Sequence, residues 1–459
     1  MPLRRAIAAV LLFVLVALSG CAGGREISLS SGETQVYSGS SDSGSTWEAH
    51  VPPDPNGTLI LFSHGYRNAG PNPAWYESTT SHLKPLLERG YSVVASSYAT
   101  LDWAMGTAEE DQLDALDQFT AEYASDHGEF DRVIAYGQSM GGLVTGRLAE
   151  RSDTGIDTDI DAGIAACGVM AGGVDRNNHQ LDGVYAAAVL LADRPDLQIS
   201  GFSAPDEAVA PAAVISSAIT EARKTPAGRA RIAVVAALLY APTRGGVDLE
   251  DDAAVARDQA RTIEESMPVL MQRRAQIAGF IGGDSGWNAG VDYAQMIEES
   301  GRAEFIEELY DDAGLDLAED VERLSEEAEI EPDPEALRWM QRTSTLSGEL
   351  QMPVLTMHTL RDFVSPVEVS GVYEQDVERA GASEDLRQIY ADRSGHCLHS
   401  ADETVLAVEV MEQRLDEGRW PDTSAAGLRS LGDDLGLGNL RFLDYTPEPF
   451  VSTREWKES

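Results

Sequence analysis

The amino-acid sequence predicts an α/β protein: a mainly parallel central sheet flanked by helices and interrupted by a large, mostly helical insertion. Short apolar segments of strand length alternate with helical periodicity over residues 46–174. Over residues 175–345 only helical patterns occur, and the alternation resumes over residues 346–420. Strands separated by helices are typical of parallel sheets covered on both faces. Residues 46–174 and 346–420 are therefore expected to form the two halves of one core.

The N-terminus is expected to lie outside this core. Arg4 and Arg5 precede the apolar segment Ala6–Leu18, which is too short to span a bilayer and has the length of a signal-peptide core. The next residues, Leu18-Ser19-Gly20-Cys21, resemble a bacterial lipobox. This resemblance implies a signal peptide over residues 1–20, lipidation of Cys21, and anchoring at the extracytoplasmic face of the cell membrane. Ordinary signal-peptide cleavage is the alternative.

Residues 21–45 are rich in Ser and Gly and have few large apolar side chains. This composition is typical of a flexible tether, here between the lipid and the folded domain.

The composition restricts the partners of the protein. The formal net charge is −43, and the 34 basic residues include only three lysines. An acid-rich, lysine-poor surface is typical of proteins from saline habitats, where salt screens self-repulsion. Nucleic acid is not expected as a partner because phosphate binding needs a basic patch. Anionic lipids should also be repelled, which leaves the N-terminal anchor as the expected contact with the membrane.

The first half of the core is expected to contain strands and helices in alternation. The expected strands are 46–51, 58–62, 91–96, 133–136 and 162–169, and the expected helices are 81–89, 109–123 and one that begins after Ser139.

A serine turn lies at the centre of this half. Gly137-Gln138-Ser139-Met140-Gly141 follows an apolar strand and precedes a helix, which is the Gly-x-Ser-x-Gly pattern of a nucleophile elbow. A sharp strand-to-helix turn crowds its neighbours, and glycine has no Cβ to clash. Ser139 is the predicted nucleophile. The start of the helix offers free N–H groups to a developing negative charge.

The insertion over residues 175–345 is expected to be a helical cap or lid that buries the substrate. Expected helices are 185–191, 208–222, 231–240, 253–273 and 303–310, the fourth of them split by Pro268. The acidic stretch over residues 298–335 is interpreted as a solvated face.

The second half offers an acid and a base. A strand over residues 352–358 leads to Asp362, and a strand over residues 386–390 leads to Ser394-Gly395-His396-Cys397-Leu398-His399. A closing helix is expected over residues 404–415. The remaining tail, 421–459, contains a candidate strand at 441–443 and receives no functional assignment.

This arrangement resembles the α/β-hydrolase family, which orders its groups as nucleophile, acid and histidine. The resemblance implies that Asp362 is the acid and His396 the base. Asp175 and Asp161 are the alternative acids, and His399 the alternative base.

The same resemblance implies an oxyanion hole. Its two donors would be the backbone N–H groups of Met140, after the nucleophile, and Tyr66, after the segment His64-Gly65. His64 itself is interpreted as a structural histidine that fixes this loop.

Two cysteines, Cys167 and Cys397, remain after Cys21 is assigned to lipid, and an exported chain allows them to form a disulfide. The Gly-His-Cys sequence also resembles tannases and feruloyl esterases, which link the cysteine after the base to one directly before the nucleophile. Gln138 stands at that position here, so the resemblance implies Cys167 as a substitute partner.

The predicted function is hydrolysis of a carboxyl ester through an acyl-enzyme on Ser139. No metal or cofactor is implied, because no His, Cys or carboxylate cluster has ligand spacing. Two alternatives remain: a peptidase similar to prolyl oligopeptidases, and a lipid-tethered binding protein without catalysis.

Overall fold

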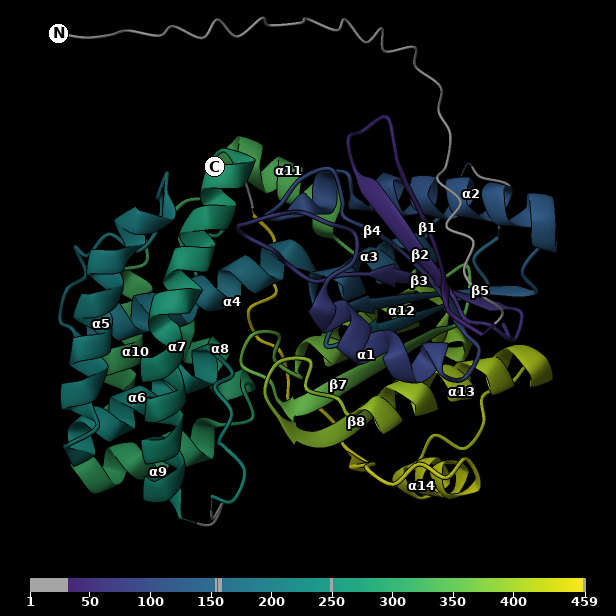
Figure 1. Cartoon of the computed structure of the whole chain (residues 1–459). Helices are drawn as coiled ribbons and strands as arrows, with labels where there is room; N and C mark the ends of the chain where they lie inside the picture. Colours follow the sequence, from purple (N-terminus) through teal and green to yellow (C-terminus); the bar gives the residue numbers. More distant parts are fainter. Residues whose placement is uncertain (1–31, 153–154, 156–158, 248–250, 457–459) are drawn as a thin grey trace, which may run out of the picture.

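The computed structural model describes residues 32–152, 155, 159–247 and 251–456 and confirms the predicted α/β class. It contains a nine-stranded sheet in the order β1-β2-β4-β3-β5-β6-β7-β8-β9. The strands from β4 to β8 pair in parallel, whereas β1, β2 and β9 join the edges antiparallel. Figure 1 shows this sheet beside a separate layer of helices formed by the insertion.

The strands are β1 Gln35–Ser40, β2 Thr46–Val51, β3 Thr58–Ser63, β4 Ser92–Ser96, β5 Arg132–Gln138, β6 Ala162–Ala166, β7 Val354–Arg361, β8 Leu386–Ser394 and β9 Phe442–Leu443. The core helices are α1 Glu77–Leu87, α2 Ala108–His127, α3 Met140–Ala149, α12 Val369–Ala380, α13 Ala401–Glu417 and α14 Ala425–Asp434.

Both faces of the sheet are buried, as a parallel sheet requires. Along β3, Leu59 and Leu61 pack on one face, and Ile60 and Phe62 pack on the other; all four are at most 3% exposed. Side chains of α2, α3 and α12 cover the first face, and side chains of α1, α13 and α14 cover the second. The continuous apolar character of the predicted strands reflects this double cover.

The cap has a hydrophobic core of its own, distinct from the two layers of the sheet. Its helices are α4 Gly172–Ala186, which continues as a π-helical turn over Ala187–Leu191, α5 Val209–Ala222, α6 Pro226–Leu238, α7 Asp252–Ile281, α8 Tyr293–Glu299, α9 Ala303–Ala313, α10 Leu317–Glu326 and α11 Pro334–Ser344. Within the predicted acidic stretch, α9 and α10 bury apolar residues on one side and expose acidic residues on the other.

The expected break at Pro268 is wrong. The helix α7 continues through Pro268 as a single helix of 30 residues. A proline inside a helix removes one hydrogen bond and costs about 3 kcal/mol. Ile263, Met267 and Met271 on either side of the proline are at most 1% exposed, so their packing in the cap core compensates for the local cost.

The tether expected over residues 21–45 also differs from the structure. Gln35–Ser40 forms β1, which pairs antiparallel with β2 along its full length. The polar composition of this segment misled the prediction, because an edge strand half exposed to solvent needs few apolar residues. The predicted signal peptide, lipobox and Cys21 lie outside the described residues.

The C-terminal tail is part of the folded unit. After α14 and β9 it runs between the sheet and the cap, the yellow segment in Figure 1. The Val451 N–H donates to the Tyr240 hydroxyl at 2.6 Å, and the Thr453 hydroxyl donates to Asp175 at 2.6 Å. Arg454 forms a two-pronged ion pair with the buried carboxylate of Asp182. The tail therefore ties the cap to the last strand.

No helix within the described ranges combines the length and the apolar character needed to cross a membrane.

Candidate active site

The serine turn lies between β5 and α3 and has a backbone that few residues adopt. Ser139 has φ 58° and ψ −121°. A Cβ on Gly137 would lie 1.9 Å from the Gly141 oxygen, and a Cβ on Gly141 would lie 2.0 Å from the Ser63 oxygen. Only glycine fits at these two positions, so the spacing of the motif follows from the close contact of β5, α3 and β3.

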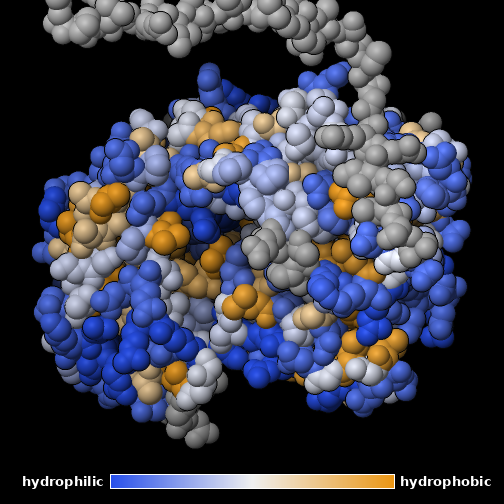
Figure 2. Space-filling model, viewed as in Figure 1, coloured by the Kyte–Doolittle hydropathy of each residue, from blue (hydrophilic) through white to orange (hydrophobic). Residues whose placement is uncertain are grey.

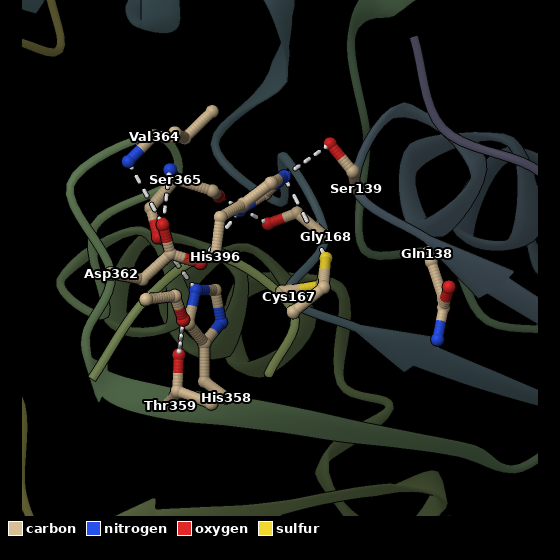
Figure 3. Close-up of a disulfide and its surroundings, with 12 residues drawn as sticks. Gln138, Ser139, Cys167, Gly168, His358, Thr359, Asp362, Val364, Ser365 and His396 are labelled. Atoms are coloured by element: carbon tan, nitrogen blue, oxygen red, sulfur yellow. Dashed lines mark hydrogen bonds and ion pairs between the residues drawn. A yellow bond between two sulfur atoms is a disulfide. The ribbon is translucent and has the colours of Figure 1, made fainter. Parts of the chain in front are cut away.

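His396 and Asp362 reach Ser139 from the ends of two neighbouring strands (Figure 3). His396 Nε2 lies 2.7 Å from Ser139 Oγ, and His396 Nδ1 lies 2.7 Å from Asp362 Oδ2. An ionised carboxylate only accepts, so Nδ1 carries a proton toward Asp362, and Nε2 is left to accept from the serine hydroxyl.

Asp362 is 1% exposed and is held on both oxygens. Its Oδ1 accepts the backbone N–H of Val364 at 2.8 Å and that of Ser365 at 3.1 Å. Burial would raise the pKa of this carboxyl. The positive charge that His396 carries when protonated, its hydrogen bond, the nearby His358 and the Ser365 N–H outweigh burial and lower the pKa below its ordinary value. Asp362 is therefore ionised at neutral pH.

A disulfide joins Cys167, directly after β6, to Cys397, the neighbour of His396. The two Cα atoms are 5.3 Å apart, and 230 residues separate them in sequence. Figure 3 shows the disulfide beneath the histidine, with Gln138 pointing away from it. The bond fixes the histidine loop to the strand next to the serine turn.

Cys167, His396 and Cys397 are also the only set of His, Cys and carboxylate side chains in the described residues whose donor atoms lie close enough together for a metal ion. Since the two sulfurs are bonded to each other, neither is a thiolate, the form that binds metal.

The two predicted oxyanion donors lie beside Ser139. Met140 is the first residue of α3, where a helical N–H has no partner within the helix. On the other side, a Cβ on Gly65 would lie 3.1 Å from the Ser139 Cβ and 3.6 Å from its Oγ, so the backbone leading to Tyr66 passes directly over the serine.

His64 supports this backbone, as expected. Its ring nitrogens lie 2.6 Å from the Gly65 oxygen and 3.2 Å from the Ser97 oxygen. Burial and the nearby charge of Arg67 lower the pKa of His64 to about 3, so the ring is neutral.

The alternative residues serve other purposes. Asp161 accepts the Val133 N–H at 2.8 Å, far along the sheet from the serine turn, and Asp175 accepts from the tail. His399 is buried, and burial lowers its pKa to about 3. None of these three side chains contacts Ser139 or His396 in the described part of the chain.

A cavity of about 470 Å³ opens beside His396, between the core and the cap. Figure 2 shows the surface hollowed between these two parts, with hydrophobic residues at the edge. Residues after β7 and β8 form the core wall. Side chains from α4, α7 and the segment 242–244 form the cap wall. Five apolar side chains also line the cavity: Pro242, Val269, Leu270, Phe363 and Val364.

Four arginines line the same cavity, and sequence reasoning assigned a role to none of them: Arg176, Arg244, Arg273 and Arg361. Arg244 pairs with Glu265 at 2.7 Å, and Arg361 pairs with Asp392. Arg176 and Arg273 have no acidic partner among the described residues. No motif marks an arginine within a cap helix, so only the three-dimensional arrangement reveals these two.

Comparisons with known proteins give one relative in sequence and distant likenesses in structure. No family model matches the chain. The o-phthalyl amidase of Xanthobacter agilis is 28% identical over 445 residues, which cover 87% of this chain and 92% of the amidase.

Two solved structures illustrate the structural likeness. The acylaminoacyl peptidase of Pyrococcus horikoshii has a TM-score of 0.38 and 14% identity, covering 84% of this chain and 42% of the peptidase. An esterase from Aspergillus oryzae has a TM-score of 0.40 and 14% identity, covering 85% of this chain and 81% of the esterase. This chain thus spans less than half the length of the peptidase. TM-scores this low carry no information about activity.

Proposed function

We propose that this protein is a serine hydrolase that cleaves carboxyl esters through an acyl-enzyme on Ser139. The observation that carries the proposal is the unbroken line of hydrogen bonds from Ser139 Oγ through His396 to Asp362, with 2.7 Å at each contact. Three side chains from distant parts of the sequence meet in the order and tautomer that acyl transfer requires.

Each group has a defined role in the proposed mechanism. His396 Nε2 takes the proton of the Ser139 hydroxyl as Oγ attacks the substrate carbonyl. The backbone N–H groups of Met140 and Tyr66 stabilise the oxyanion, and Asp362 stabilises the imidazolium. His396 then protonates the leaving group, and the same steps run with water to release the acid.

Amide hydrolysis is the second candidate, because the sequence relative is an amidase that matches nearly the whole chain. Both reactions share the acyl-enzyme and differ in the leaving group, which needs more help from the His396 proton in an amide. The prolyl oligopeptidase-like alternative is a special case of amide cleavage.

A fluorophosphonate probe tests the nucleophile and separates catalysis from mere binding. We expect stoichiometric labelling of the wild type and none of Ser139→Ala, whereas Ser125→Ala on the exposed side of α2 labels as the wild type does. Equal labelling of the wild type and Ser139→Ala would refute the proposal and favour the binding protein.

Matched nitrophenyl esters and nitroanilides of the same acyl groups then separate the two reactions. Higher kcat/KM for esters supports the esterase, and comparable values support the amidase. Aminoacyl nitroanilides identify the peptidase. The assays are run in concentrated salt, since the acidic, lysine-poor composition supports a saline habitat.

We also propose that the protein is exported and anchored by lipid at Cys21. The lipobox-like sequence supports this proposal, and the Cys167–Cys397 disulfide is in keeping with an oxidising compartment. Cys21→Ser should abolish incorporation of labelled palmitate and release the protein from membranes. Retention of label in this variant would exclude lipidation at Cys21.

A further inference from the structure

We propose that the substrate carries a carboxylate and that Arg176 and Arg273 on the cap wall bind it, an inference that rests on the proposed hydrolase function. Both side chains line the cavity beside His396.

Arg176 lies on α4 and is 4% exposed. Its guanidinium carries five N–H donors. Among the described residues it donates one side-chain hydrogen bond, from Nη1 to Asn177 Oδ1 at 3.1 Å, and it faces the Trp103 ring at 5.3 Å. Burial and the charges of Arg273 and Arg274 lower its pKa to about 9, so it remains positively charged at neutral pH. Arg176 lines the cavity, and no further side-chain hydrogen bond joins its guanidinium to a described residue.

Arg273 lies on α7 and is mostly buried, and this burial lowers its pKa. Its guanidinium lies 5.4 Å from the centre of the Tyr66 ring, the residue whose backbone passes the serine. It forms no ion pair or side-chain hydrogen bond with any described residue. The two guanidinium groups are close enough for the charge of Arg273 to lower the pKa of Arg176, and both line the cavity that His396 also lines.

Other arginines of the cap and its borders show how unusual this is. Arg274, the sequence neighbour of Arg273, pairs with Asp284 at 3.0 Å. Arg231 pairs with Asp320 at 2.7 Å, and Arg302 pairs with Glu368 at 3.1 Å. The chain has 77 acidic residues, yet among the described residues only Glu265 lines the cavity, and it pairs with Arg244. Arg176 and Arg273 are thus two cavity-lining arginines for which the described residues offer no acidic partner.

An unpaired charge away from water is costly, so two adjacent guanidinium groups of this kind favour an anion that binds between them. The planar fork of arginine matches a carboxylate with two parallel hydrogen bonds. The apolar side chains that line the same cavity would hold the hydrocarbon part of the same molecule. The site therefore fits a compact, partly apolar substrate with a carboxylate near its scissile bond.

Matched substrates test this inference. Mono-4-nitrophenyl esters of aliphatic and aromatic dicarboxylic acids are compared with the same esters after the free carboxylate is capped as a methyl ester. For the best pair of substrates, we expect the wild-type kcat/KM to be at least tenfold higher for the ester with the free carboxylate than for the capped ester. Arg273→Met and Arg176→Met should reduce this ratio to about one while still cleaving the capped ester.

The ratio of the two kcat/KM values distinguishes loss of carboxylate binding from damage to the fold. An unfolded variant loses activity on both the free-carboxylate ester and the capped ester. Arg261→Met is the matched control: it removes an exposed arginine from the same helix, α7, and should keep the wild-type ratio. If Arg176→Met does not fold, the more accessible Arg273→Met decides alone. A wild-type ratio near one for every pair of esters would overturn the inference.

A binding measurement keeps this result separate from the proposed function. Benzoate and benzamide have the same shape and differ in charge. In Ser139→Ala, benzoate should raise the midpoint of thermal unfolding and benzamide should not, and Arg273→Met should abolish the benzoate shift. If the wild type hydrolyses none of the esters but Ser139→Ala still shows the benzoate shift, the hydrolase proposal is refuted and the anion site stands. Equal shifts for the two compounds would refute the anion site.

Discussion

The cavity beside His396 has two walls that are built in different ways. On the core wall, Asp362 has a partner on each oxygen, and His396 has one on each ring nitrogen. On the cap wall, Arg176 is buried and Arg273 is partly buried, and neither has an acidic partner among the described residues. The hydrogen-bond partners of the core wall are all supplied by the protein, whereas on our proposal the cap wall takes its partner from the substrate.

This difference indicates that the core supplies the reacting groups and that the cap selects the substrate. When the protein supplies every hydrogen-bond partner, the geometry of the reacting groups is fixed before the substrate binds. The substrate then has to supply only the carbonyl that is attacked. A buried charge without a partner discriminates among substrates. A ligand that lacks the opposite charge leaves this charge unpaired and therefore binds more weakly. We therefore expect changes in the core wall to abolish the rate and changes in the cap wall to alter the choice of substrate.

The largest effect is expected from Asp362→Asn. The side-chain oxygen can still accept from Val364 and Ser365, but the amide N–H₂ would face His396 Nδ1 and favour the wrong tautomer. We expect kcat to fall by about 10⁴-fold with little change in KM. Steady-state kinetics on a nitrophenyl ester measure this.

Asp392→Asn is the matched control for that variant. It removes an exposed acid at the end of β8 that pairs with Arg361 and does not contact His396. Its kcat should stay within threefold of the wild type. If Asp362→Asn retained more than a tenth of the wild-type kcat, Asp362 would not be the orienting acid.

The serine turn on the core wall could be predicted from the sequence because its backbone requires particular residues. The serine turn needs glycine at 137 and 141, since a Cβ would collide with the Gly141 and Ser63 oxygens. The strand order then fixes where Asp362 and His396 emerge, at the ends of the adjacent strands β7 and β8. The serine motif and the strand pattern describe local backbone, which the sequence records, whereas the roles expected for Asp362 and His396 came from the resemblance to the α/β-hydrolase family.

The features of the cap wall and of the edges of the molecule could not be predicted from the sequence, because tertiary packing determines them. Pro268 stays inside α7 because its neighbours are buried in the cap core. β1 exists because β2 offers an open edge, and Thr453 meets Asp175 only after the tail crosses the molecule. An arginine without a partner is defined by what surrounds it in space, which no local pattern records.

The next largest effect is expected on stability, from removal of the disulfide on the core wall. Cys167→Ser with Cys397→Ser opens a covalent loop with a sequence separation of 230 residues and should lower the free energy of unfolding by about 3 kcal/mol. Urea unfolding monitored by tryptophan fluorescence measures this, and a reducing agent should affect only the wild type. Unchanged unfolding midpoints with and without reductant would show that the disulfide does not stabilise the fold.

A smaller effect, on the cap side, concerns Asp175, the carboxyl bound by the tail. Burial, together with the charge of Asp376, outweighs the Thr453 hydrogen bond and Arg454 and raises the pKa of Asp175 from about 3.8 to about 7. The folded state thus holds this proton more tightly than the unfolded state. Stability from this group is present below about pH 4 and is lost as the pH rises to about 7.

Asp175→Asn removes that titration, and its amide oxygen can still accept from Thr453. Relative to the wild type, the variant should gain about 2 kcal/mol of unfolding free energy between pH 5 and pH 8. Urea unfolding of both proteins at the two pH values, in the same salt, gives the difference directly. A constant difference would mean that Asp175 is ionised throughout this range.

The smallest effect is expected from Arg244, an arginine of the cap wall that has an acidic partner. Arg244 lines the same cavity as Arg273, but it pairs with Glu265, and the two side chains are 44% and 65% exposed. An exposed ion pair contributes less than about 1 kcal/mol. Arg244→Gln should therefore change the unfolding free energy by less than that and alter the carboxylate preference less than twofold, against at least tenfold for Arg273→Met. Equal losses of preference in the two variants would mean that the cavity responds to total charge rather than to an unpaired guanidinium.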